Sequence, residues 1–485
     1  MSKPPTTFMS VSVFLFEFDI KSGPLLLGSI TDHDFTDDHL RVLTQSAFPE
    51  STISNINEKM IFFTFTLQNP TLFCFSLYIR TSNPNLPRFH QQDTFIIVTD
   101  LPYYTPFYHF LMSSMSLIDS ESMTFKDILE IFGDFAKKWV KQLPAKRVDL
   151  PMFVSSLPVA APAKATDFFE EIGIYLISDT FMDIDICSAL GVHTLMKLGK
   201  TKDILKLWEI SLLGEDLVVF GANANFASNA VLAITSLSFP IIERSKDAIF
   251  PYVSFTDSRN HDKSFLQSLK TKTASNMKII GISNPMLIDL YGLTYVFNIG
   301  FAGQNSSSYE EGLLNSRSGK WNFLSNVENV TSKIIRKQLY ENTVKVINVI
   351  KNAFFDLCEL NPYEAINGNL DIDAIAAFLY EYDVDIVMDY DEFAQKLIYT
   401  KFSKRICTKL SKDPKMEKLL AQFPIIQHCQ KLDENNKIEL YAQIDDYKKI
   451  VSDNEKLLSI VEKHQLAVKL SITPDLINAE IDTPQ

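Results

Sequence analysis

The sequence of 485 residues has little cysteine, and its few thiols are not arranged for metal binding or cross-linking. None lies in a CxxC pair, and the five are spread over the whole chain: Cys74, Cys187, Cys358, Cys407 and Cys429. Structural zinc sites and disulfide frameworks use thiols at characteristic close spacings. We therefore expect neither, and reduced thiols are the simpler interpretation.

Long apolar runs are also missing. No window approaches the roughly 18 uncharged apolar residues that a membrane-spanning helix needs, and the apolar stretch near the N-terminus is interrupted by Glu17 and Asp19. That stretch alternates as a β-strand does, which argues against a signal peptide. We therefore expect a cytoplasmic protein.

Positive charge is scarce beside negative charge. The chain has 46 Lys and Arg residues against 59 Asp and Glu residues, a formal net charge of −13. Nucleic-acid binding draws mostly on Lys and Arg meeting phosphates, so nucleic acid is not an expected partner. The same balance weighs against attachment of the whole chain to anionic lipid by charge alone.

The motifs of common catalytic and cofactor sites are absent from the sequence. It has no GxxxxGK phosphate loop, because Thr194 stands five residues before the glycine of "GKTKD". It has no GxSxG elbow and no HExxH pair. The segment "NGNLDIDAIAAF" begins like a calcium loop, but it lacks the glycine at its sixth position and ends in Phe378 where glutamate is needed. We expect no cofactor, no metal and no covalent chemistry of the chain's own.

What the chain does contain is apolar and aromatic: 46% of its residues are hydrophobic, and 37 are Phe. Residues 1–143 read as strands followed by helices, an α+β pattern of an antiparallel sheet with helices laid on it. Strands fit residues 11–16, 59–67, 71–80 and 93–100, with a turn at Lys21–Pro24. Thr36 is a candidate N-cap of one helix, and Thr124 with Asp127 forms a capping-box pattern for another.

Residues 144–166 form a linker with four prolines, expected to be extended and to lie against a domain. Residues 167–302 then alternate between strand and helix periods. Strands are predicted at "GIYLIS", "LVVF", "PYVSF", "MKIIGIS" and "YVFNIG", with helices between them, one of which ends at Gly214. Strands separated by helices indicate an α/β domain with a largely parallel sheet.

The remaining chain is a polar loop at residues 303–319, predicted to be a mobile surface segment, and a helical region at residues 320–485. Charge is polarised in this region. The acidic run at Asp383–Glu392 is interpreted as a solvated loop and helix N-terminus. The basic run at Lys401–Lys418 places Phe402, Ile406 and Leu410 at helical spacing, so it reads as an amphipathic helix. Its cationic face is either simply solvated or a contact for a partner or lipid.

Several stretches resemble motifs of the DENN domain family. "LWEISLLGEDLVVFG" (207–221) is similar to "LWELVLLGEPLLVL" of the DENN class six subfamily. "PYVSFTDS" (251–258) resembles its "PYFTIHDS", and "IIGISNPML" (279–287) its "VLGVTNPFF". "AFPES" (47–51) resembles an SFPDS-type motif, and "VTDLPYYTPFYHFL" (98–111) the family's S-x-L-P strand and helix. Thr256 replaces the family's His, and Arg259-Asn260 stand where Glu-Phe is expected.

This resemblance implies a longin-like N-terminal lobe, a central α/β DENN lobe and a helical C-terminal part. It also implies guanine nucleotide exchange on a Rab-type small GTPase in membrane traffic, with peripheral recruitment to endosomal or Golgi-derived membranes through that GTPase. The α/β core then needs no phosphate loop, because the nucleotide belongs to the partner. The alternatives are a non-catalytic DENN-fold interaction protein, a component of a GTPase-activating complex and a metabolic enzyme. The oligomeric state is left open.

The candidate GTPase-binding residues follow two central strands, since loops at the carboxyl ends of strands are where open α/β sheets bind their ligands. Asp257 and Ser258 follow one strand; Asn284 and Pro285 follow another and open a helix. Each pair could instead serve only as a cap or rigid turn. Arg259 is the candidate arginine finger for the GTPase-activating alternative, and it could also be an ordinary loop residue.

Overall fold

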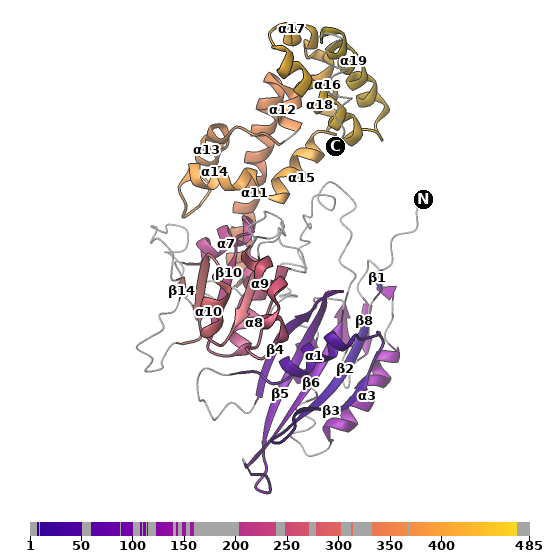
Figure 1. Ribbon diagram of the computed structural model, residues 1–485, viewed down its shortest axis with the longest axis vertical. Coiled ribbons are helices and arrows are strands. Elements are labelled where there is room, and N and C mark those ends of the chain that lie inside the picture. Colours follow the sequence, from indigo (N-terminus) through magenta and orange to yellow (C-terminus); the bar gives the residue numbers. More distant parts are fainter. Residues whose placement is uncertain are drawn as a thin grey trace. The chain divides into compact units, whose positions relative to one another are not determined.

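A computed structural model of the chain describes residues 7–8, 10–50, 60–87, 89–99, 107–108, 110–112, 114, 123–138, 142–143, 148–151, 156–159, 203–238, 248–270, 278–301, 312–313, 332–366 and 368–472. The chain divides into two compact units. Unit 1 comprises Met1–Thr166 and Tyr175–Tyr340, and unit 2 comprises Asp167–Ile174 and Glu341–Gln485. The fold is mixed: a β-sheet region comes first, and the C-terminal part is helical (Figure 1).

Unit 1 begins with a five-stranded sheet in the order β3-β2-β6-β5-β4. Its strands are β2 (Val11–Asp19), β3 (Gly23–Ile30), β4 (Met60–Leu67), β5 (Leu72–Ser82) and β6 (His90–Thr99). Every neighbouring pair is antiparallel. The four strands and the turn predicted for this segment are confirmed.

Strands β2, β4, β5 and β6 are buried on both faces of the sheet, because they carry large apolar side chains at successive positions, whereas the edge strand β3 is partly exposed. Val13 belongs to a core closed by α3 (Phe125–Lys138). Its neighbour Phe14 points to the opposite face, into a core closed by α1 (Asp37–Ser46) and by α8 (Ala224–Thr235). Since α8 belongs to the second sheet's part of the chain, one face of the first sheet is completed by a segment about 200 residues away in sequence.

Strand β3 was not predicted. Gly23, with φ +77°, makes the expected turn, and the chain then pairs with β2 along the edge of the sheet. The sequence gives a weak strand signal here, since Pro24 and Gly28 are poor strand formers and three consecutive leucines break the alternation. Pro24 is tolerated because it lies at an edge, where its missing N–H costs no ladder bond.

The predicted helix caps of this region are confirmed. The Thr36 hydroxyl accepts a bond from the His39 amide, and the His39 ring accepts one from the Thr36 amide. Ahead of α3, the Thr124 amide donates to the Asp127 carboxylate, and the Asp127 amide donates to the Thr124 hydroxyl. Such reciprocal bonds satisfy amides that have no partner inside the helix.

Short strands occupy the next stretch. β7 (Gln142–Leu143) pairs with β1 (Thr7–Phe8), and β8 (Val148–Pro151) forms an antiparallel hairpin with β9 (Ser156–Val159). The extended backbone expected of residues 144–166 is confirmed at β8 and β9, while their pairing with each other was not predicted. The predicted strand "GIYLIS" lies outside the described residues.

The second sheet of unit 1 has the order β11-β12-β10-β13-β14. It is formed by β10 (Leu217–Gly221), β11 (Ile249–Phe250), β12 (Ile279–Ile282), β13 (Tyr295–Ile299) and β14 (Gly312–Leu313). The first four strands in this order are parallel, and β14 is antiparallel to β13. The largely parallel sheet is confirmed; β14 falls within the predicted polar loop, whose other residues lie outside the described ranges.

The helices of the second sheet lie close to their predicted positions. They are α7 (Ile204–Leu212), α8, α9 (Lys263–Lys270) and α10 (Met286–Tyr291). Gly214, with φ +68°, follows α7 as predicted. Helix α8 begins at Ala224 rather than near Ser228, because the Asn223 side chain caps it by accepting a bond from the Phe226 amide.

The strand predicted at "PYVSF" is wrong. The pairing stops at Phe250, and residues 251–255 are not a strand. Pro251 has no amide hydrogen to donate, so the ladder cannot continue through it. A single bond from the Val253 amide to the Gly281 carbonyl (2.8 Å) still holds the segment against β12.

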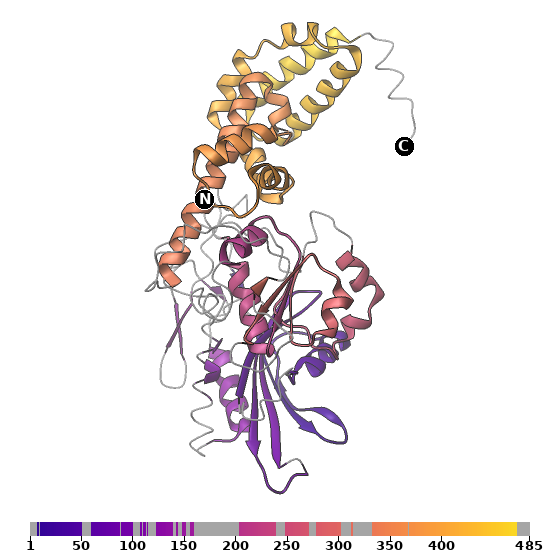
Figure 2. The same cartoon turned by 90° about the vertical axis from the view of Figure 1, so that its left-hand side faces the viewer.

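Unit 2 is an assembly of helices, as the sequence predicts. Figure 2 shows α18 and α19 running side by side. The helices from Ser332 onward are α11 (Ser332–Leu360), α12 (Pro362–Ile366), α13 (Ile372–Glu381), α14 (Tyr390–Ile398), α15 (Lys401–Leu410), α16 (Pro414–Gln422), α17 (Ile425–Gln430), α18 (Glu434–Ile450) and α19 (Glu455–Ser471). Asp389 caps α14, which confirms the interpretation of the acidic run as a loop and helix N-terminus. Phe402, Ile406 and Leu410 are buried, as the amphipathic pattern predicts, but the basic run is divided between two helices, because α15 ends at Leu410 and Asp413 caps α16.

Candidate functional site

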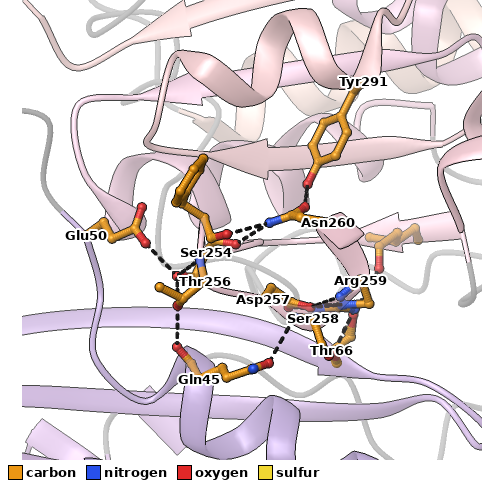
Figure 3. Close-up of polar contacts among 12 residues, drawn as sticks. Gln45, Glu50, Thr66, Ser254, Thr256, Asp257, Ser258, Arg259, Asn260 and Tyr291 are labelled. Carbon is orange, nitrogen blue, oxygen red and sulfur yellow. Dashed lines mark hydrogen bonds and ion pairs between the residues drawn. The ribbon is translucent and has the colours of Figure 1, made fainter. Parts of the chain in front are cut away.

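Three of the stretches that carry family-like motifs meet in unit 1. The segment 251–262 follows β11, the segment 283–285 follows β12, and residues 45–50 comprise the end of α1 and the residues after it. Because β11 and β12 are parallel neighbours, their carboxyl ends lie at the same edge of the second sheet. The site described below is the polar junction that these three segments form (Figure 3).

Asp257 is the centre of the first segment and is completely buried. It caps a short 3-10 helix (Ser258–His261), where its carboxylate accepts a bond from the Arg259 amide (2.9 Å). The same carboxylate accepts three further bonds from the Arg259 side chain, two from Nε (3.0 and 3.1 Å) and one from Nη2 (2.6 Å). The capping role that the sequence allowed for Asp257 is confirmed.

Arg259 ties this segment to the first sheet. Its Nη1 donates to the Thr66 carbonyl of β4 (3.2 Å), and its guanidinium lies over the Phe250 ring, 5.5 Å from the centroid. Burial by itself would lower the pKa of Arg259, but the Asp257 carboxylate outweighs it and the pKa is raised. The guanidinium is therefore charged, paired and 11% exposed, which does not favour a role as an arginine finger.

Gln45 in the last turn of α1 and Glu50 after that helix bind the exposed side of the same segment. The Thr256 hydroxyl donates to the Gln45 carbonyl (3.2 Å), and the Ser258 amide donates to the Gln45 side-chain oxygen (2.9 Å). The Ser254 hydroxyl donates to the Glu50 carboxylate (2.9 Å). Figure 3 shows these bonds joining the two sheets' segments on either side of Asp257.

The two loops of the second sheet are joined to each other through Tyr252. Its hydroxyl lies 3.1 Å from the Ser283 hydroxyl and accepts a bond from the Glu50 amide (3.2 Å). The Ser283 hydroxyl in turn donates to the Glu50 carbonyl (3.0 Å). Burial raises the pKa of the Tyr252 phenol, and the nearby Glu50 carboxylate adds to the effect, so this group stays a neutral hydrogen-bonding hub.

Asn260 fixes the far end of the segment. Its amide nitrogen donates to the carbonyls of Ser254 (2.8 Å) and Phe255 (3.0 Å), and its oxygen accepts a bond from the Tyr291 hydroxyl of α10 (2.6 Å). The loop is therefore held on both sides, and its conformation is set by buried polar groups rather than by its own backbone ladder.

The second pair of predicted residues opens α10. The Asn284 side chain accepts a bond from the Met286 amide (3.0 Å), and Pro285 is the residue that precedes the first turn. Both are half-buried, as is Ser258. The structure thus pairs Asp257 with Arg259 and places Asn284 and Pro285 at the neighbouring strand end. Whether any of them binds a partner stays a prediction.

The sequence reasoning missed the apolar residues of this edge. Phe255 is 38% exposed and Met286 is 66% exposed, and each lies next to a predicted residue pair. It also missed Gln45, which makes two of the bonds across the junction. The sequence does contain a signal for the exposure of Phe255 and Met286. Phe255 ends the apolar stretch after β11 and Met286 begins α10, and a large apolar residue at such a boundary need not lie in the core.

The described residues include neither a metal-binding cluster nor a membrane-spanning helix. Among them, no group of three or more His, Cys, Asp or Glu side chains is placed to hold a metal ion. Within the same ranges, no helix has the length and apolar character required to cross a membrane.

Comparison with known proteins gives two related sequences. No family model matches the chain. It is 24% identical to Protein DENND6B of Mus musculus over 231 residues, which cover 46% of this chain and 37% of the mouse protein. It is 23% identical to Protein DENND6B of Homo sapiens over 221 residues, 44% of this chain and 36% of the human protein. The match thus spans little more than a third of the length of these relatives.

Proposed function

Because the chain is a DENN-domain protein related to the DENND6 proteins, we propose that it is a guanine nucleotide exchange factor that promotes GDP release from a Rab-type small GTPase. The observation that carries this proposal is the junction itself. Three separate motif stretches converge on one edge of the α/β sheet, where a rigid polar network supports the exposed apolar side chains of Phe255 and Met286.

Exchange asks of the protein only that it bind the nucleotide-free GTPase better than the loaded one. To invert a 1:99 ratio of two states, a binding protein must bind the favoured state more tightly by about 5.5 kcal/mol of binding free energy. That difference can be spread over an interface and needs no nucleophile, metal or cofactor. A sequence without a phosphate loop or hydrolase motif suits this chemistry, since the nucleotide and magnesium are bound by the partner.

The proposed contact surface is the carboxyl edge of β11 and β12. Phe255 and Met286 are its apolar anchors, because aromatic residues and Met are enriched in protein interfaces. Ser258, Asn284 and Pro285 flank them, and Gln45 and Glu50 supply the facing surface from the first sheet. Asp257 and Arg259 contribute by positioning the loop, since both are buried and bonded to each other.

In this proposal the protein is cytoplasmic and reaches endosomal or Golgi-derived membranes through its GTPase. The N-terminal sheet corresponds to the longin-like lobe of the family, the second sheet to the central DENN lobe, and the helices from Ser332 onward to the downstream region. The extended loop after β11 is fixed at both ends. Such a loop is better suited to press as a rigid element against the partner's switch regions than to adapt its conformation to the partner.

The test is a nucleotide-release assay with a fluorescent GDP analogue on a panel of Rab proteins. We expect the full chain to accelerate release from at least one of them. Phe255→Ser with Met286→Ser should lower the exchange rate at least tenfold without changing thermal stability. Phe89→Ser is the matched control, because Phe89 is an exposed apolar residue (70%) in the β5–β6 hairpin and should leave exchange unchanged.

Other outcomes of the same panel separate the alternatives. Binding of a Rab without release would assign the chain to non-catalytic interaction proteins, and accelerated GTP hydrolysis would assign it to the GTPase-activating group. Asp257→Asn should lower the thermal stability, and the exchange rate should fall only as far as the loss of folded protein explains. A loss of exchange at full stability would instead place the Asp257 carboxylate in the interface.

A further inference from the structure

Helices α15 and α16 of unit 2 carry a row of cations that the proposed exchange surface does not use. Residues 401–418 contain two acidic residues, Asp413 and Glu417, and seven basic ones. The basic residues are Lys401, Lys404, Arg405, Lys409, Lys412, Lys415 and Lys418. This stretch is strongly positive in a chain whose formal net charge is −13.

The cations of α15 share one face of the helix. Residues three and four apart lie on the same side of a helix, so Lys401, Lys404 and Arg405 share one side of α15, and Lys412 continues this stripe just past the C-terminus of the helix. The opposite side, with Phe402 and its apolar neighbours, is buried in unit 2. Lys404 is exposed and Arg405 half-exposed, while Lys412 is paired with Asp453 at 3.1 Å. The buried side fixes the helix and holds the stripe outward. We call this stripe the α15 face.

We propose that the α15 face docks on an anionic lipid bilayer. The core of unit 2 occupies the apolar side of the helix, so the helix has no free face to insert between lipids, and adhesion is electrostatic. Tyr399, 59% exposed, stands two residues before Lys401 at the start of the stripe. Tyr is a side chain that settles at the level of lipid headgroups, which favours a bilayer over other polyanions.

The negative charge of the rest of the chain does not oppose this contact. At physiological salt the screening length is about 8 Å, and the surface potential of a membrane falls off over that distance. A bilayer therefore responds to the nearest residues and not to the net charge. Charge is also separated along the chain, since residues 371–392 hold eight acidic residues and no Lys or Arg.

The shape of the α15 face also favours a bilayer over an acidic peptide or a nucleic acid. The cations follow a single convex helix, which suits a flat surface and offers no groove to enclose an extended chain. Single-stranded nucleic acid is held by aromatic side chains interleaved with the cations, and Tyr399 stands alone at one end of the stripe. The proposal does not depend on the exchange function, because it concerns a different unit and a different ligand.

The experiment is co-sedimentation of the full chain with vesicles. We expect binding to phosphatidylcholine vesicles that contain about one third phosphatidylserine, and none to phosphatidylcholine alone. Raising the ionic strength from about 0.1 M to about 1 M shortens the screening length from about 10 Å to about 3 Å and should release the protein. Each basic residue near such a surface strengthens binding about fivefold, so Lys404→Gln with Arg405→Gln should weaken it about 25-fold.

The control variant carries Lys456→Gln and Lys463→Gln on α19. Both of these lysines are exposed, and the double change removes the same charge from the same unit. It should leave vesicle binding within about twofold of the original. Equal losses in the two variants, or no vesicle binding by the unmodified chain, would overturn the proposal. So would binding of labelled polyglutamate or oligonucleotide through Lys404 and Arg405 in the absence of vesicle binding.

Discussion

Asp93 shows what a single buried carboxyl does in the first sheet. It lies on β6, 3% exposed, directly opposite Glu17 of β2 in the strand register. Burial is the main cause that raises its pKa to about 6, and the Glu17 charge adds to it, while a bond from the Gln91 side chain (3.2 Å) acts in the opposite direction. A carboxylate in this position is a net cost to the fold whenever it is ionised.

The sign of the pH dependence follows from the raised pKa. In the unfolded chain this carboxyl titrates near 3.8. Its contribution to stability is therefore fully present below about pH 4 and is lost as pH rises through about 6. We predict that Asp93→Asn raises the free energy of unfolding at pH 7.5 by about 2 kcal/mol, and that the gain disappears below pH 4.

Tryptophan fluorescence during urea unfolding measures this effect, because all three tryptophans (139, 208 and 321) belong to unit 1. The matched control is Glu130→Gln on α3, an exposed carboxyl that should change stability by less than about 0.5 kcal/mol at either pH. A stabilisation by Asp93→Asn that is the same at pH 4 and pH 7.5 would contradict the assignment.

At the scale of elements, the second sheet depends on how closely β12 approaches its neighbours. A Cβ on Gly281 would collide with the Pro251 carbonyl oxygen and stand 3.1 Å from the Ala227 carbonyl oxygen of α8. Both obstacles are backbone atoms, so they can move only if the loop after β11 or the helix moves. That close approach lets the Val253 amide bond to the Gly281 carbonyl and so starts the loop that carries Asp257.

We predict that Gly281→Ala destabilises unit 1 by about 3 kcal/mol or more, because the added methyl group meets backbone that cannot yield. Gly133→Ala on α3 is the matched control. The nearest atoms to its Cβ would all belong to the Ile30 side chain, with the movable Cδ1 the closest, and Ala is favoured over Gly inside a helix. Its stability should stay within about 1 kcal/mol of the original in the same urea titration.

At the scale of the whole molecule, charge is the property that the two proposals share. The chain carries 13 more negative than positive charges, yet residues 401–418 hold seven basic residues against two acidic ones. A negative protein is drawn toward basic patches on a partner over distances of about a screening length. The long-range field thus acts on encounter with a GTPase, and the local patch acts on contact with lipid.

We predict that salt slows the association of the two proteins but not the release of GDP within their complex. Raising the ionic strength from about 0.1 M to about 1 M should lower kcat/KM for GDP release severalfold and leave kcat nearly unchanged, since screening weakens steering and not the final interface. GDP release by EDTA from the same Rab is the control for effects of salt on the GTPase itself. An increase of kcat/KM with salt would contradict a steering role for the negative charge.

The sequence by itself determined the order and type of most elements, because their signals are local. Alternating Phe-rich runs predict strands such as β4. Thr36 and Thr124 predict helix N-termini, because their side chains can cap the first turn. It also carried the relation to the DENND6 proteins, since motif stretches keep their identity without a structure. Prediction from the sequence failed where the local signal is weak. Strand β3 was missed because it contains Pro24 and Gly28. A strand was predicted after Pro251 because the residues there are apolar, although the pairing ends before that proline.

Only the tertiary structure decided what the candidate residues do. Asp257 and Arg259 look like exposed loop residues in the sequence, but they form a buried ion pair, since the Thr66 carbonyl and the Phe250 ring come from elsewhere in the chain to enclose the guanidinium. The partners of Thr256 and Ser258 are more than 200 residues away, at Gln45. Burial and long-range hydrogen bonds depend on which segments the fold brings together, and no local pattern encodes that.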